Sequence, residues 1–282
     1  MARSPSSSVQ TAREALAARL REVRLDAGLT AREVALQAGW HPSKASRLEN
    51  AITPPSDADI RAWCGICGAG DQAADFIAAS RSAESMYVEW RRVQRTGLRR
   101  LQESYVPLFE RTRTFRIYCS NVVPGLLQTP AYATALLSEI TDFRQSPNDV
   151  TEAVAARMDR ARVLRQGDHR FAILVEEAVL RYRMGDAEVM AGQLGHLLSI
   201  MSLPAVSLGV VPFTAFRGMW PLETFSVYDS EQAQVELLTA AVNVTAPSEV
   251  AQYATAFDQL SEMAVYGSPA RALIAEAIGT LG

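Results

Sequence analysis

The feature that most constrains the fold is a pair of short helices that must both lie within residues 29–50. Thr30 and Glu33 have the spacing of a capping box, in which two side chains satisfy free backbone N–H groups at a helix start. Gly39 ends this helix after about two turns, and Pro42 suits the first position of the next helix. Two short helices joined by a glycine-containing turn have the dimensions of a helix-turn-helix motif.

Apolar residues at helical spacing predict one further helix on each side of this pair, over residues 12–27 and 56–67. The first residues lack the apolar stretch of a secretory signal, so we expect a flexible tail over residues 1–11. The two central helices can approach each other closely because the residues expected to face inward, Ala35, Ala38 and Ala45, have small side chains. The sequence therefore predicts an all-α helix-turn-helix domain over residues 12–70.

The second half of the chain has a different pattern, with short β-branched or aromatic runs bounded by turn residues. We predict strands within 114–123, 170–175, 205–212, 222–229 and 234–239. Predicted helices cover about 130–140, 149–166, 186–202, 247–265 and 269–280. These elements predict an α+β domain over residues 111–282, joined to the first domain by a mostly helical connector over residues 71–110.

Composition limits the classes of protein that the chain can belong to. Of 282 residues, 48% are hydrophobic, so a sizeable core can form, and no apolar run of about 18 residues predicts a membrane span. Three cysteines give no disulfide framework, which favours a reducing cytoplasm. Residues 1–68 carry 9 Lys/Arg and 7 Asp/Glu, whereas the remainder carries 19 and 24. A mildly basic head on an acidic body permits local contact with DNA.

The second helix of a helix-turn-helix enters the major groove. Here Ala45 and Leu48 are expected to face the core, which leaves Lys44 and Arg47 exposed to contact phosphate or guanine. Lys44 is the only lysine of the chain, although a coding bias toward arginine would also explain that. The predicted DNA-binding residues are Thr30, Arg32, His41, Ser43, Lys44, Ser46, Arg47 and Asn50.

The stretch LTAREVALQAGWHPSKASRLENA resembles the Xre-type, or lambda-repressor-like, family of helix-turn-helix regulators. The resemblance implies that Glu49 anchors to an arginine of the first helix, here Arg21 or Arg24, and that Arg47 touches the DNA backbone. Operator specificity does not transfer from relatives, because the chain departs from the family pattern at three positions. These are Ala31, His41 and Ala51, where the family often has glutamine, serine and glycine.

The rest of the chain resembles an actinobacterial branch of that family, whose large second domain is often linked to a small partner protein in toxin–antitoxin-like pairs of the Scr type. The sequence segments that match this branch are VVPGLLQTPAYATALL, ARMDRARVL, EEAVLRYRMGDAEVMAGQLGHLL, LGVVPF and VELLT. The resemblance implies an N-terminal lambda-repressor-like domain followed by a larger α+β regulatory domain. It names no effector.

Two segments of the second domain are candidates for a ligand or partner site. After the Pro124–Gly125 turn, Gln128 and Tyr132 could line a pocket, although this segment also suits a purely architectural role. Aromatic residues cluster around Arg217 in a loop between strands that ends near Trp220. Loops often carry function, so this loop is a candidate rim for a ligand or partner, and simple loop packing is the alternative.

One enzymatic hypothesis is compatible with the sequence. Arg116 and Glu236 on neighbouring strands, with Glu176 and Glu177 after another, could hold a dinucleotide as in mono-ADP-ribosyltransferases. Buried ion pairs explain the same residues more simply. The candidate ligand or partner residues are Arg116, Gln128, Tyr132, Glu176, Arg217, Trp220 and Glu236.

Other motifs support neither a metal site nor a cofactor site. Cys64 and Cys67 have the spacing of a redox motif or half a zinc site, but two small core residues on a helix explain them better than a sensor thiol. A basic stripe at Arg91, Arg92, Arg95, Arg99 and Arg100 is either a solvated face or a secondary contact for phosphate or an acidic partner. Phosphate-binding loops and hydrolase motifs are absent from the sequence.

Together these patterns predict a cytoplasmic transcriptional regulator that binds a double-stranded operator as a homodimer. Its second domain is expected to sense a small-molecule effector or a small partner protein. An antitoxin-like component and, less favoured, an ADP-ribosyltransferase-like enzyme are the alternatives.

Overall fold

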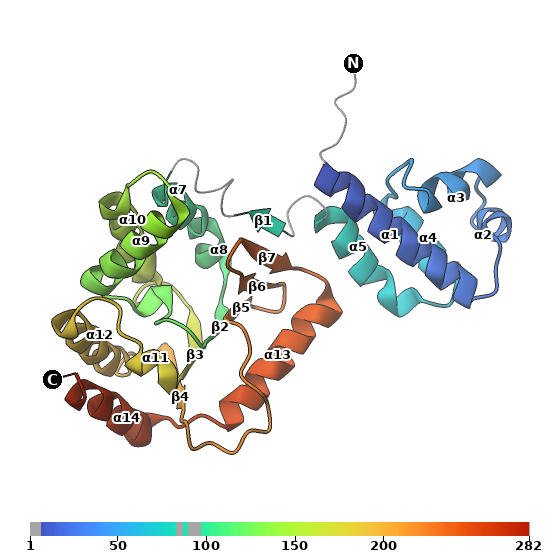
Figure 1. Ribbon diagram of the computed structural model, residues 1–282. Helices are drawn as coiled ribbons and strands as arrows, with labels where there is room; N and C mark the ends of the chain where they lie inside the picture. Colours follow the sequence, from blue (N-terminus) through green and yellow to red (C-terminus); the bar gives the residue numbers. More distant parts are fainter. Residues whose placement is uncertain (1–6, 83–86, 90–96, 282) are drawn as a thin grey trace. The chain divides into compact units, whose positions relative to one another are not determined.

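A computed structural model describes residues 7–82, 87–89 and 97–281 (Figure 1). The chain divides into a smaller helical unit, which contains the N-terminal residues, and a larger unit built around a sheet. This confirms the predicted order of an all-α helix-turn-helix domain followed by a larger domain of mixed α and β structure. No helix among the described residues is long and apolar enough to cross a membrane.

The N-terminal unit is a bundle of short helices. They are α1 (Ser7–Asp26), α2 (Ala31–Gln37), α3 (Pro42–Glu49), α4 (Asp57–Ile66), the 3-10 turn η1 (Gly70–Gln72) and α5 (Ala73–Ser82). Helix α1 already begins at Ser7, so residues 7–11 of the expected tail belong to this helix. The predicted caps are confirmed: Thr30 and Glu33 form a reciprocal capping box on α2, and His41 caps α3 through the backbone N–H of Ser43.

The core of this unit lies around Trp63, whose side chain is fully buried and donates through Nε1 to the carbonyl of Leu20 at 2.9 Å. Residues from all five α-helices surround it, and α5 contributes Phe76 and Ile77. Helix α5 therefore completes the helix-turn-helix core, although its residues fall in the predicted connector.

The remainder of the predicted connector is not one long helix. It contains the short strand β1 (Tyr87–Glu89) and the helices α7 (Arg99–Ser104) and α8 (Val106–Arg111). Of the basic stripe, residues 91, 92 and 95 lie outside the described residues. The start of α7 is fixed by Asp149, whose carboxylate accepts from the backbone N–H groups of Leu98 and Arg99. Gly97 has a φ of +98°, and a Cβ there would lie 2.2 Å from that carboxylate, so only glycine fits.

The larger unit is built on a mixed sheet whose described strands follow the order β1-β7-β6-β5-β2-β3-β4. Its further strands are β2 (Thr114–Cys119), β3 (Arg170–Glu176), β4 (Val206–Val211), β5 (Phe225–Tyr228), β6 (Gln232–Glu236) and β7 (Ala240–Val244). Strand β2 pairs in parallel with β3 and antiparallel with β5. Five of these strands match predicted ones, and β7 lies outside every predicted strand.

Helices cover both faces of this sheet (Figure 1). The remaining elements are η3 (Gly125–Leu127), α9 (Pro130–Arg144), α10 (Val150–Arg160), η4 (Ala161–Leu164), α11 (Glu177–Arg181), α12 (Ala187–Ile200), α13 (Pro247–Glu262) and α14 (Gly267–Gly279). The main core packs apolar residues of α9, α12 and α14 against the face that carries Phe115 and Ile117. On the opposite face the ring of Phe225 lies 5.1 Å from that of Tyr253 on α13.

The strand register decides which side chains share a face. Phe115 pairs with Tyr228, and Ile117 pairs with Ser226 across β2 and β5. Ser226 in turn pairs with Gln234 on β6. Because side chains alternate along a strand, these residues, Cys119 and Glu236 point to one face, and Arg116 and Tyr118 point to the other.

Candidate DNA-binding surface and candidate ligand pocket

The recognition helix α3 is fixed to α1 by a buried, two-pronged ion pair. Arg24 donates from Nε to Glu49 Oε1 at 2.5 Å and from Nη2 to Oε2 at 3.2 Å, and its Nη1 donates to the carbonyl of Leu29 at 2.6 Å. Both side chains are only 9% exposed. The expected anchor for Glu49 is therefore Arg24, of the two arginines considered.

With α3 held by this ion pair, one face of the helix is exposed to solvent. Ala45 and Leu48 are buried, while Arg47 is exposed. Arg47 makes no ion pair within the described residues, so its guanidinium has free donors. The other exposed polar residues of this face are Ser43, Ser46 and Asn50.

Lys44 is not exposed as expected. Its Nζ donates to Asp59 Oδ1 at 2.6 Å and lies 4.5 Å from the centre of the Trp40 ring. The Lys44 side chain is 35% exposed and that of Asp59 only 14%. Burial alone would raise the pKa of Asp59, but hydrogen bonds from Lys44 and Ser56 outweigh burial and lower it. The only lysine of the chain thus links α3 to the start of α4.

The other predicted DNA-binding residues hold the helix ends or are exposed nearby. Thr30 and Glu33 satisfy each other at the start of α2. His41 Nδ1 lies 2.8 Å from Ser43 Oγ at the start of α3. At the end of α3, Asn50 Nδ2 donates to the carbonyl of Ser46 at 2.7 Å. Arg32 is exposed on α2.

The cysteine pair of α4 packs in the core of the N-terminal unit. Cys64 is fully buried, and burial raises the pKa of its thiol to about 11, which keeps it protonated and unreactive at neutral pH. Cys67 is the C-cap of the helix, and burial raises its pKa as well. No group of metal-ligating side chains is found among the described residues.

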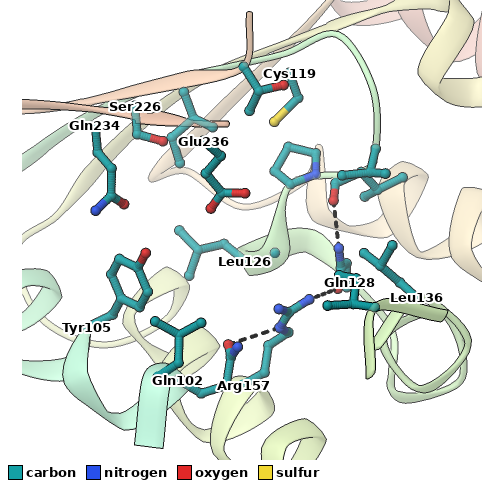
Figure 2. A pocket seen from close by; sticks show the side chains of 18 of the residues that line it. Gln102, Tyr105, Cys119, Leu126, Gln128, Leu136, Arg157, Ser226, Gln234 and Glu236 are labelled. Carbon is teal, nitrogen blue, oxygen red and sulfur yellow. Dashed lines mark hydrogen bonds between the residues drawn. The ribbon is translucent and has the colours of Figure 1, made fainter. Parts of the chain in front are cut away.

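The larger unit holds a cavity of about 470 Å³ between its sheet and the helices α7, α9 and α10. Figure 2 shows Ser226, Gln234 and Glu236 of the sheet on one side and Gln102, Gln128 and Arg157 on the other. Apolar lining residues include Leu98, Leu126, Leu136, Leu137 and Ile140. A volume of this size is typical of sites for small organic ligands.

Arginines dominate the charge of this cavity, which Arg144, Arg157 and Arg160 line together with a single carboxylate, Glu236. Arg157 donates from Nη1 to Gln128 Oε1 at 2.5 Å and from Nε to Gln102 Oε1 at 3.1 Å (Figure 2). Burial and the neighbouring Arg160 lower the pKa of Arg157 to about 10, so it stays charged at neutral pH. It remains partly exposed because it lines the cavity.

Two of the predicted ligand residues, Gln128 and Glu236, line this cavity. Tyr132 does not, because it is fully buried with its hydroxyl 3.3 Å from the backbone N–H of Val123. Arg116 points away from the cavity, to the opposite face of the sheet from Glu236. The pairing of Arg116 with Glu236 that the dinucleotide hypothesis requires is therefore not formed, since strand alternation separates them.

The remaining predicted residues lie away from the cavity, with Glu176 at the end of β3 and Arg217 and Trp220 in the loop between β4 and β5. Glu176 is buried, accepts from Tyr118 Oη at 2.7 Å, and takes two hydrogen bonds from Arg217 at 2.8 and 2.5 Å. This ion pair ties the loop to the end of β3. Phe216 and Trp220 of the loop are 92% and 67% exposed, so their rings cover no core.

Comparison with known protein families matches both units. Residues 15–76 match a family described as a helix-turn-helix domain, and residues 102–276 match a domain of unknown function, DUF5753. The second match covers more than half of the chain. The protein belongs to the DUF5753 family. No curated protein matches the chain.

The helix-turn-helix match includes α3 and its anchor, so it supports a DNA-binding regulator. The DUF5753 match begins at Gln102 and includes the cavity arginines, among them Arg157 and Arg160 of α10. Neither arginine is among the ligand residues predicted from the sequence. Their signal is present, because they continue the buried stripe of α10 that begins with Val150, Ala153 and Val154 at helical spacing.

Proposed function

We propose that this protein is a sequence-specific transcriptional regulator of the Xre type, which acts in the cytoplasm and binds operator DNA through α3. Its DUF5753 domain senses a small ligand or a small partner protein and performs no catalysis. The observation that carries the proposal is the position of Arg47 on the exposed side of α3, while Arg24 and Glu49 hold the helix from behind.

The proposal includes a homodimer on DNA. A single recognition helix reads few base pairs and gives modest affinity, whereas two half-sites about one helical turn apart multiply it. The exposed hydroxyls of Ser43 and Ser46 suit close approach to the phosphate backbone. Lys44 supports α3 rather than contacting bases, because its ammonium group is already paired with Asp59.

The test starts from operator sites selected by the full-length protein from random duplex DNA. Dissociation constants are then measured over a range of salt for the parent, for Arg47→Ala, and for Arg113→Ala as the matched control. Arg113 is an exposed arginine of the other unit. Loss of a base contact costs about 1–3 kcal/mol, and loss of a phosphate contact lowers the salt slope of log K by about one.

We expect one of these two effects for Arg47→Ala and neither for Arg113→Ala. If Arg47→Ala binds the selected sites as tightly as the parent, with the same salt dependence, α3 is not the recognition helix.

A second candidate function, an antitoxin-like role with a small partner protein, is favoured by the loop around Trp220. Aromatic side chains are enriched at the centres of protein–protein contacts. Here the Arg217–Glu176 ion pair fixes the loop while Phe213, Phe216 and Trp220 stay exposed. A fixed loop with exposed rings loses little conformational entropy on binding, which favours affinity for a partner.

A further inference from the structure

The cavity of the DUF5753 domain contains an arginine that forms no ion pair within the described residues, and Glu236, the carboxylate that lines the same cavity, attracts it only from a distance. Arg160 is only 8% exposed, and its guanidinium is stacked on Tyr105 and Phe109, with Cζ 5.0 and 4.9 Å from the ring centres. Its single hydrogen bond to the described residues runs from Nη1 to the carbonyl of Gln102 at 3.4 Å. Its Nε is buried and has no hydrogen-bond partner among them.

Arg157 adds a second positive charge that is only partly compensated. Its two partners, Gln102 and Gln128, are neutral amides. Burying a charge without a counter-charge lowers the stability of the folded protein, so a buried ion is usually paired with a group of opposite charge. Three arginines line the cavity against one carboxylate, Glu236, so the excess of positive charge favours an anion that comes from outside the chain.

Both guanidinium groups border the same small space. A Cβ added at Gly125 would lie 3.6 Å from Arg160 Nη2 and 3.9 Å from Arg157 Cζ. Gly125 also lines the cavity, so the missing side chain leaves room beside the two arginines. Arginine donors arranged in this way suit the oxygens of a carboxylate or a phosphate.

The other residues that line the cavity indicate which groups the rest of the ligand carries. Leu126, Leu136 and Ile140 supply apolar walls that suit a hydrocarbon or ring portion. Ser226, Gln234 and Glu236 lie across the cavity from Arg157 (Figure 2), where they can accept hydrogen bonds from a hydroxyl, amide or amine.

We propose that this cavity binds a small amphipathic organic anion, whose carboxylate or phosphate group lies at Gly125 between Arg157 and Arg160 and whose apolar portion contacts the leucines. The proposal deepens the ligand-sensing part of the proposed function. Binding itself does not require that the protein bind DNA.

The test uses the full-length protein and the fluorescent probe 8-anilinonaphthalene-1-sulfonate, which joins an anionic group to an apolar ring system. N-phenyl-1-naphthylamine, which lacks the sulfonate, is the neutral control. Competition with octanoate, octyl phosphate and 1-octanol then distinguishes a carboxylate from a phosphate and both from an apolar chain alone. We expect the sulfonate probe to bind, and one or both octyl anions, but not 1-octanol, to displace it.

The variants Arg157→Gln and Arg160→Gln should each weaken binding of the sulfonate probe by about tenfold or more, because each removes a charge-assisted hydrogen bond. Arg113→Gln, outside the cavity, is the matched control and should not change it. Equal binding by the parent and both cavity variants would overturn the proposal, as would equal loss of the neutral probe.

Gly125→Ala tests the site without removing a charge, in case the arginine variants fold poorly. Its methyl group would sit at ordinary contact distance from Arg160 Nη2, in the space assigned to the anion. We expect weaker binding of the sulfonate probe with an unchanged melting temperature. Gly192→Ala on α12, where a Cβ meets nothing within 4 Å, is its control. Undiminished binding by Gly125→Ala would refute the assigned position of the anionic group.

Operator affinity is measured separately, with and without the displacing anion. If the arginine variants lose the anion but operator affinity never responds to it, the anion site stands and the ligand-controlled part of the proposed function fails. If operator affinity responds while the variants still bind the sulfonate probe normally, the anion site proposed here is wrong.

Discussion

Replacing Glu49 with alanine should destabilise the helix-turn-helix domain rather than change its base preference. The substitution removes both carboxylate oxygens that accept from the buried side chain of Arg24, which leaves its Nε and Nη2 unpaired. Only the bond from Nη1 to the carbonyl of Leu29 remains. Leaving a buried charge without a partner is one of the few ways in which a single substitution greatly lowers the free energy of unfolding.

Removing one partner of a buried ion pair typically costs about 3–5 kcal/mol. A domain of this size has a free energy of unfolding of about 4–11 kcal/mol, at about 0.05–0.15 kcal/mol per residue. The loss is therefore a large part of the total, and it should raise the unfolded population of the domain by about a hundredfold or more, at about 1.4 kcal/mol per tenfold. Glu49→Gln keeps one acceptor for Arg24 and should lose less.

The assay is hydrogen exchange followed by mass spectrometry on the full-length protein, because it reports each unit separately. Peptides from α1 and α3 should exchange faster in Glu49→Ala, while peptides from residues 102–276 keep their protection. The control is Glu103→Ala, since Glu103 forms an exposed pair with Arg99 on α7. Exposed pairs contribute about 0–1 kcal/mol, so protection of the N-terminal unit should not change.

The reasoning would be refuted if α1 and α3 in Glu49→Ala kept parental protection. A change in the sequence of the selected operator sites with protection intact would show that Glu49 is a base-contacting residue instead.

Two further predictions concern Trp220 and Lys44. Trp220→Ala should leave the operator affinity of the purified protein unchanged but remove the difference in affinity between buffer and cell extract. Phe143→Ala, which changes an exposed ring on α9, is the control and should keep that difference. If Trp220→Ala loses DNA binding itself, or still shows the full difference, the loop has no regulatory role. Lys44→Ala should lower stability by about 1 kcal/mol through loss of its hydrogen bond and its contact with Trp40. The lowered pKa of Asp59 implies that the stability it contributes is present above its unfolded-state pKa of about 3.9 and is lost as pH falls through the lower folded-state value. Denaturation midpoints between pH 7 and pH 3 should therefore fall less steeply in Lys44→Ala than in the parent, and parallel curves would argue against the ion pair.

Local chemistry accounts for most of what the sequence predicted in the N-terminal unit. The Thr30–Glu33 box and the His41 cap act within three residues, so spacing alone identifies them. The start of α1 at Ser7 and the inclusion of α5 in the core were not predicted. The place of α5 depends on packing in the core around Trp63, which local patterns do not encode.

The second unit shows where sequence patterns fail. Strand β7 begins with two alanines, which have weak strand propensity, and it follows β6 through a turn closed by a bond from Leu237 N–H to the carbonyl of Ala240. Its pairing in the sheet, rather than its composition, makes it a strand.

By itself the sequence determined the helix-turn-helix motif, the order of the two domains and most strands, because caps, turns and periodicity are properties of neighbouring residues. Only the tertiary structure decided which polar side chains meet. The strand register placed Arg116 and Glu236 on opposite faces, and α10 carried Arg157 and Arg160 into the cavity. The tertiary structure also directs Lys44 away from the expected DNA surface and toward Asp59, 15 residues away. The ammonium group gains a charge-assisted hydrogen bond to a partly buried carboxylate and a contact with the ring of Trp40.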